Sequence, residues 1–302
     1  MKRIRYIGLT LLLLLLTATG LRAANTIEAD SRRHRLSVTG TGGLGTLLYS
    51  LENAKYKAGA GGSVGVSYDF YFLPYMGIGS GIEFSFLRSS YRVGERSYAV
   101  AAQDNDPMFG GAGEAFTFLV EMRNEETTQR AAYLRIPLML RFRLKWFSFG
   151  AGVKAGFPLK GSYSRFMGEL KTSGEYGRFP EPLEDMPAHG FVNGRAVYGD
   201  GGLKLRTDWA VSVDFGITLR PRGQGKGKGG RVPFLEAGIF ADYGLRNIHK
   251  GEAGEPIYPI AYDAAVSGRL RHHSGLVSAS GKPASLHSLL VGIRLAVGLS
   301  WR

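Results

Sequence analysis

Ten charged side chains fall at alternate positions within segments whose other positions are apolar. The acids are Glu83, Asp208, Asp214, Glu236 and Asp242, and the bases are Arg135, Arg141, Arg143, Lys154 and Arg294. A charge removed from water must be paired, because an unpaired one costs several kcal/mol. The pattern therefore predicts an enclosed network of ion pairs, in which Lys154 and Asp214 are the expected partners.

The histidines are the other residues with catalytic potential. His273 and His287 each stand directly before a serine, an arrangement that nucleophilic catalysis uses when an acid orients the base. Neighbouring residues of a strand point to opposite faces, so His287 and Ser288 are not expected to act together. His272 and His273 with Asp263 lack the ligand spacing of a metal site. We therefore expect no catalytic residue, no cofactor and no bound metal.

The charged residues lie in segments that alternate with the period of two of a β-strand. Between residues 75 and 92, Ile82 and Phe84 share one face, whereas Glu83 and several glycines share the other. One face suits hydrocarbon and the other suits a polar lumen, as in membrane barrels. Eight such segments are expected: 34–49, 59–72, 75–92, 134–143, 147–159, 208–219, 235–245 and 289–301.

The predicted fold is an all-β, antiparallel, up-and-down transmembrane barrel of eight strands within residues 25–302. The connections at 73–74 and 145–146 are short, whereas those at 93–129, 161–206 and 247–284 are long loops. Outer-membrane barrels have this asymmetry, with short periplasmic turns and long extracellular loops. Residues 114–123 also alternate, either as a ribbon that extends an outer loop or as two further strands, giving ten.

The N-terminus and the composition indicate export. Three basic residues, an apolar run at 11–16 and then Ala23-Ala24 predict a cleavable signal peptide over residues 1–24. The chain has no cysteine, so it has no thiol for lipid attachment. With 38 Lys+Arg against 25 Asp+Glu it is basic. In an exported protein, outer-membrane lipid or lipopolysaccharide is the expected partner and nucleic acid is not. Envelope proteins are further candidate partners, through the long loops or the basic, glycine-rich turn 222–231.

Three motifs resemble a known family. The three motifs are Leu134-Arg135-Ile136-Pro137-Leu138, the strand from Phe147 to Gly156, and the Gly-Ile-Arg-Leu sequence at Gly292. They resemble the outer-membrane β-barrel domain of Bacteroidetes-type bacteria, a family that includes PorT-like proteins. The resemblance covers most of residues 34–302. It implies a barrel in the outer membrane of a Gram-negative bacterium, and a possible association with secretion machinery.

A barrel of eight strands is just wide enough for side chains to fill it, so the charged lumen is expected to be closed. The leading hypothesis is a non-enzymatic integral outer-membrane protein. It would serve as a structural or surface-binding protein, or as an accessory component of an envelope or secretion assembly. Two alternatives stay open at this point: an enzyme acting on lipopolysaccharide or peptides at the outer rim, and a narrow passive channel.

Overall fold

The computed structural model describes residues 32–49, 54–104, 114–220, 230–250, 258–263, 270–272 and 285–302, which are mostly strands. The strands are β1 (His34–Tyr49), β2 (Ala54–Tyr71), β3 (Met76–Asp104), β4 (Glu114–Leu144), β5 (Phe147–Glu175), β6 (Arg195–Gly202), β7 (Asp208–Leu219), β8 (Val232–Gly244), β9 (Ile260–Tyr262), β10 (Leu270–His272) and β11 (Leu286–Trp301); η2 (Pro187–His189) is a 3-10 turn. The described residues include no helix long and apolar enough to cross a membrane. The predicted signal peptide, residues 1–24, lies outside these ranges.

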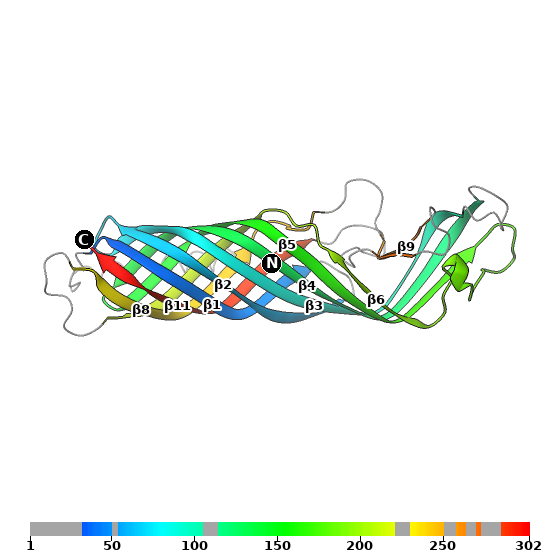
Figure 1. Cartoon of the computed structure of the whole chain (residues 1–302), viewed down its shortest axis with the longest axis horizontal. Helices are drawn as coiled ribbons and strands as arrows, with labels where there is room; N and C mark the ends of the chain where they lie inside the picture. The colour runs from blue at the N-terminus through cyan, green and yellow to red at the C-terminus, as the bar shows by residue number, and fades with distance from the viewer. Residues whose placement is uncertain are drawn as a thin grey trace, which may run out of the picture.

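Eight of the strands close into a barrel (Figure 1). The order around the ring is β4-β3-β2-β1-β11-β8-β7-β5, and β5 pairs back with β4. All of these pairings are antiparallel. The predicted eight-stranded antiparallel barrel is therefore confirmed. Residues 114–123 belong to β4, so the ten-stranded alternative is wrong and the ribbon alternative is right.

The outer surface of the ring is a continuous apolar band. Large aliphatic side chains on strands all round it are more than half exposed, including Ile82 at 59%, Leu138 at 60%, Ile239 at 63% and Ile293 at 62%. Apolar surface of this extent is costly in water, whereas in hydrocarbon it is the expected exterior of a barrel.

The strands are strongly staggered around the ring. The hydrogen-bond register, followed from strand to strand, leaves β2 at Tyr71 and returns to β2 at Gly61, ten residues earlier. It passes through Tyr71, Gly77, Arg141, Gly150, Asp214, Phe240, Gly292, Gly43 and Gly61. Such a stagger tilts the strands by about 40° from the barrel axis. Residues at the same depth in the membrane therefore lie on diagonals across the sheet.

Both ends of the barrel sequence meet at one rim. His34, which begins β1, pairs with Trp301 at the end of β11. The short connections around Pro74 and Lys145 lie at this rim as well (Figure 1). Short turns of outer-membrane barrels face the periplasm, so the opposite rim is the extracellular one.

Three strands continue far beyond the extracellular rim. β3, β4 and β5 contain 29, 31 and 29 residues, whereas about 9–11 suffice to span a bilayer. Their outer parts form a curved sheet, called the extension below, which β6 joins along β5 (Figure 1). The prediction of long loops was therefore wrong for much of 93–129 and 161–206, and 247–284 contributes β9 and β10. Inward and outward side chains still alternate in these segments, so the segments continue as strands and their backbones pair with the neighbouring strands.

Within the extension the ladders are interrupted at a row of three residues, called the bend row: Gly94 in β3, Asn124 in β4 and Gly168 in β5. The ladders run up to Val93–Glu125 and resume at Glu95–Arg123, so Gly94 and Asn124 are skipped. β4 and β5 skip Asn124 and Gly168 in the same way. Asn124 has φ 54°, a left-handed conformation that asparagine tolerates better than most residues. Across this row the buried positions change from odd to even numbers in β3 and β4.

Candidate functional site

Charged side chains fill the periplasmic part of the lumen. Arg35 lies 2.9 Å from Glu236, which also receives a hydrogen bond from Arg294. Arg141 donates to both oxygens of Asp214, at 2.8 and 2.7 Å, and lies 3.3 Å from Asp69. All of these groups are buried or nearly so. Ion pairs in which each group is shared between partners allow so many charges to remain inside.

A second cluster lies nearer the membrane centre and the extracellular rim. The Lys154 ammonium is 3.0 Å from a carboxylate oxygen of Glu83 and 3.0 Å from one of Asp242. Arg135 lies 2.8 Å from Asp208 and 3.4 Å from Asp242, so Asp242 joins the two cations. The Ser288 hydroxyl donates to Asp208 at 2.7 Å.

The predicted pair Lys154–Asp214 is wrong. In the β5–β7 ladder Lys154 is opposite Ala210, and Asp214 is opposite Gly150. Gly150 is in turn the ladder partner of Arg141 in β4. Because glycine has no side chain, Arg141 reaches across this position to Asp214. The pairing depended on the stagger of the ring, which the alternation pattern does not specify.

Among the described residues, nine of the ten predicted charges lie in carboxylate–cation contacts with one another or with Arg35 and Asp69. The tenth, Arg143, lies at the periplasmic rim, where it donates to the backbone carbonyls of Pro74 and Arg32 and stacks 3.8 Å from the centre of the Tyr71 ring. Two members of the network were missed: Arg35 and Asp69. Both follow the inward parity of their strands, so the alternation would have identified them. With them, the lumen charges named so far among the described residues are six acids and six bases.

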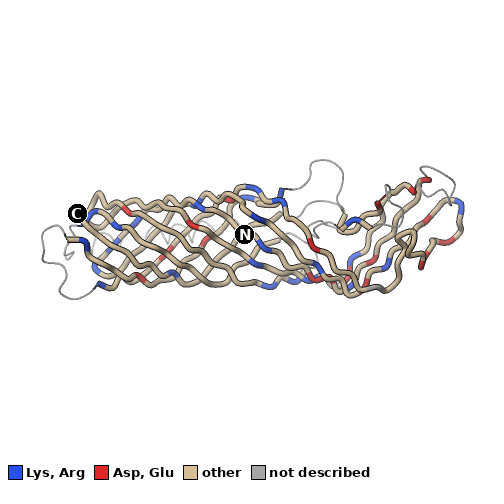
Figure 2. Tube along the Cα trace, viewed as in Figure 1, with Lys and Arg blue, Asp and Glu red and all other residues tan. Residues whose placement is uncertain are grey.

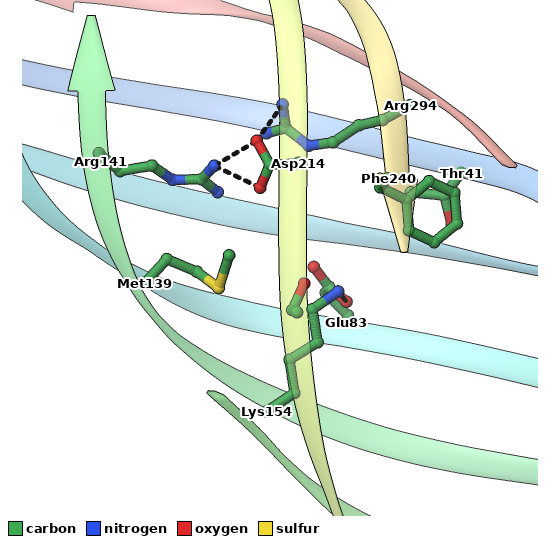
Figure 3. A pocket seen from close by; sticks show the side chains of 9 residues that line it. Thr41, Glu83, Met139, Arg141, Lys154, Asp214, Phe240 and Arg294 are labelled. Atoms are coloured by element: carbon green, nitrogen blue, oxygen red, sulfur yellow. Dashed lines mark hydrogen bonds and ion pairs between the residues drawn. The ribbon is translucent and has the colours of Figure 1, made fainter. Parts of the chain in front are cut away.

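One small cavity lies among the packed charges. Between Glu83, Lys154, Arg141, Asp214 and Arg294 lies a cavity of about 10 Å³ (Figure 3). That is roughly the space one water molecule needs. This cavity between the described side chains therefore has room for about one water molecule.

Above the charges, the extracellular mouth is closed by apolar side chains. The strands and the connections both contribute fully or almost fully buried side chains. The strands supply Leu47, Leu87, Tyr133, Leu286 and Leu290, and the connections supply Leu203 and Ile248. Backbone hydrogen bonds hold these connections in place, from Leu203 N–H to Gly161 O and from Ile248 N–H to Leu286 O. The lumen is therefore polar inside the membrane and apolar at its outer end.

The extension has an apolar core of its own. Its buried members are Phe116, Phe118, Val120, Met122, Met167, Leu170, Tyr176, Phe191 and Ile260. Ile260 belongs to β9, which Tyr98 fixes by donating to the Ile260 carbonyl and accepting from its N–H, both at 2.8 Å. Burial raises the pKa of the Tyr98 hydroxyl. β9 thus lies against the inner face of the extension.

An ion cluster that the sequence did not reveal lies between the two cores. Glu125 is 3.4 Å from Arg165 and 3.7 Å from Arg96, and all three are buried. Arg96 comes from beyond the bend row and Glu125 from before it, yet they face the same side. Recognising this cluster requires the change of parity at the bend row, which only the backbone shows.

The residues weighed for catalysis are scattered. His287 stacks on Tyr243 and lies 3.1 Å from the Gly244 carbonyl, and Asp263 binds Arg271. His273 and most of the basic turn 222–231 lie outside the described residues. Within the described ranges, no group of three or more His, Asp or Glu side chains is arranged to hold a metal ion.

A closed ring with a lipid-compatible exterior and a charge-filled interior defines the class of integral outer-membrane barrels. Residues 28–249 match the family model of the outer membrane protein beta-barrel domain. The chain belongs to this family, which places it in the outer membrane. A search of the curated proteins finds no match.

Proposed function

We propose that this protein is a non-enzymatic, closed outer-membrane barrel that holds a rigid extracellular extension for binding another component of the cell envelope. The observation that carries the proposal is the extension itself, a sheet with its own core that continues three membrane strands. The resemblance to PorT-like proteins favours an envelope or secretion assembly as the setting. Binding residues are expected on such rigidly held outer segments.

The outer side of the extension offers an aromatic pair as the contact point. The rings of Tyr198 in β6 and Phe166 in β5 lie 5.0 Å apart, and the two side chains are 78% and 37% exposed. Exposed tyrosine and phenylalanine on a rigid sheet are typical of binding hot spots. They lie beyond the membrane band, so lipid does not account for their exposure.

Crosslinking tests this role. A photo-reactive amino acid at position 198 should capture one defined envelope protein in intact cells, whereas the same group at the lipid-facing position 138 should not. The double substitution Tyr198→Ser with Phe166→Ser should abolish copurification of that protein while leaving the barrel folded. Unchanged copurification would contradict the proposal.

The closed lumen is tested separately by conductance in planar bilayers. Wild-type protein should give no stable single-channel steps, because the lumen is blocked by the ion pairs and by the apolar mouth. A stable step of porin size would refute the closed barrel and favour the channel alternative.

A further inference from the structure

Four exposed cations lie on the outer face of the barrel where it passes into the extension. They are Lys57 in β2, Arg88 in β3, Arg130 in β4 and Lys160 in β5, and we call them the basic belt. Figure 2 shows basic segments gathered at this junction. Among the described residues, none of the four has a carboxylate partner. Glu126, further out on the same face, is engaged by Arg92 at 2.7 Å.

The four residues lie at one depth, although they are not ladder partners of one another throughout. Arg88 is opposite Arg130, whereas Lys57 is opposite Ser90, two residues further out along β3, and Lys160 is opposite Ala132, two residues further in along β4. From β2 to β5, the hydrogen-bonded partner on each next strand lies further toward the extracellular side by slightly more than one residue, because the register shifts by ten residues around the whole ring. The belt residues step inward from β2 to β3 and from β4 to β5, and these steps offset the outward shift.

This depth is the outer edge of the membrane. In β3 the lipid-facing stretch Met76–Phe86 contains 11 residues, about the number a tilted strand needs to span the hydrocarbon. Arg88 is the next outward-facing position. In β4, Arg130 is the first charge beyond Leu134, and in β5 Lys160 directly follows the exposed Leu159. The belt therefore stands at the level of the headgroups.

The pair Arg88–Arg130 is unfavourable as it stands. Like charges directly opposite each other on neighbouring strands destabilise a sheet, since their Cβ atoms are only about 5 Å apart. An anion bound between the two arginines attracts both guanidinium groups and so replaces their repulsion with a net attraction. Guanidinium groups suit phosphate in particular, because they donate two parallel hydrogen bonds to it.

We propose that the basic belt binds the phosphate groups of a glycolipid in the outer leaflet, with Arg88 and Arg130 as the central ligands and Lys57 and Lys160 at the flanks. The proposal rests on the orientation used above, with the extension outside the cell. It names the surface through which the expected lipopolysaccharide partner is held. Lipid bound there would brace the strands at the base of the extension.

Lipid retention tests the proposal. Full-length protein in detergent is mixed with bis-phosphorylated lipid A, with dephosphorylated lipid A of the same acyl composition, or with inorganic phosphate, and bound lipid is counted by native mass spectrometry. Wild-type protein should retain the bis-phosphorylated lipid. The variant Arg88→Gln with Arg130→Gln should bind it at least about tenfold more weakly, because charge-assisted hydrogen bonds are lost.

The matched control is Arg92→Gln with Arg123→Gln. It removes the same charge from the same face, further from the membrane, where both arginines already contact carboxylates. Its lipid affinity should equal that of the wild type. Lys57→Gln with Lys160→Gln should give a smaller loss than the arginine variant, and it decides the question if the arginine variant does not insert.

Three outcomes would overturn the proposal: full retention by both belt variants, equal retention of dephosphorylated lipid A, or binding of inorganic phosphate as tight as that of the lipid. A fourth readout separates binding from structure. Without lipid, Arg130→Gln should unfold at a higher temperature than the wild type, and a purely structural arginine would show the reverse. None of these measurements depends on a partner at Tyr198, so the two proposals fail separately.

Discussion

The lumen and the extension are built from the same three strands, yet they are filled with opposite kinds of side chains. Inside the membrane, β3–β5 turn their apolar residues outward to lipid and their charges inward. Beyond the bend row, the same strands turn Phe116, Phe118 and Val120 inward and place charges such as Glu121 and Arg123 outside. The medium outside the sheet, lipid or water, decides which side chains face outward. At Asn124 the inward-facing residues change from odd to even numbers, so the same strand is apolar outside in the membrane and apolar inside beyond the bend row.

Breaking one lumen contact should have the largest effect. Arg135→Met leaves Asp208 buried without its cation, which costs about 3–5 kcal/mol. Urea unfolding in vesicles, followed by tryptophan fluorescence, should show this loss. The exposed Arg123 is the control, because Arg123→Met removes contacts of 3.5 and 3.8 Å at the surface that are worth little. Equal effects of the two substitutions would refute the contrast.

A cavity in the extension should act locally. Phe118→Ala removes a fully buried ring, at a cost of about 3–5 kcal/mol. The tryptophans Trp146, Trp209 and Trp301 all lie in or beside barrel strands, so their unfolding signal should be unchanged. Protease cleavage within the extension should rise instead, much more than for Leu119→Ala on the opposite face. A parallel shift of the tryptophan transition would show that the two regions unfold together.

A smaller loss is expected where the network needs a glycine. A Cβ at Gly150 would overlap Arg141 Nη1 and Asp214 Oδ2, so Gly150→Ala should destabilise the barrel by about 1–3 kcal/mol. Gly40→Ala is the matched change, because a Cβ there meets no atom within 4 Å. Urea midpoints of the two variants measure the difference, and identical midpoints would argue against the Arg141–Asp214 contact.

The smallest effect concerns pH. The pKa of Tyr98 is raised above its ordinary value of about 10, so its contribution to stability is complete below about pH 10 and is lost as the pH rises further. Ionised Tyr98 can no longer donate to Ile260. Protease sensitivity of the extension should therefore increase above this pH. Tyr98→Phe should weaken that pH dependence, and an unchanged profile would assign it to other groups such as Tyr176, whose pKa burial also raises.

Much of the barrel follows from the sequence because its environment imposes a strict rule. Because lipid lies on one side of the sheet and a narrow lumen on the other, Leu134 and Ile136 must face lipid and Arg135 must face the lumen. The strands and the direction of their side chains can therefore be predicted from the sequence. The partner of Lys154 was not readable, because it depends on the stagger of the whole ring. The role of Phe116 and Phe118 was ambiguous for a related reason: they share the even numbering of the lipid-facing residues, and only the backbone at Asn124 reverses their side.

The bend row also sets how the molecule responds to mechanical load. A pull on the tip of the extension is transmitted through β3, β4 and β5 to strands that are anchored in the bilayer. At Gly94, Asn124 and Gly168 the β3–β4 and β4–β5 ladders are interrupted together, so one residue pair is missing from each of them along this line. A load on the tip is therefore expected to act at this line before it disturbs the barrel.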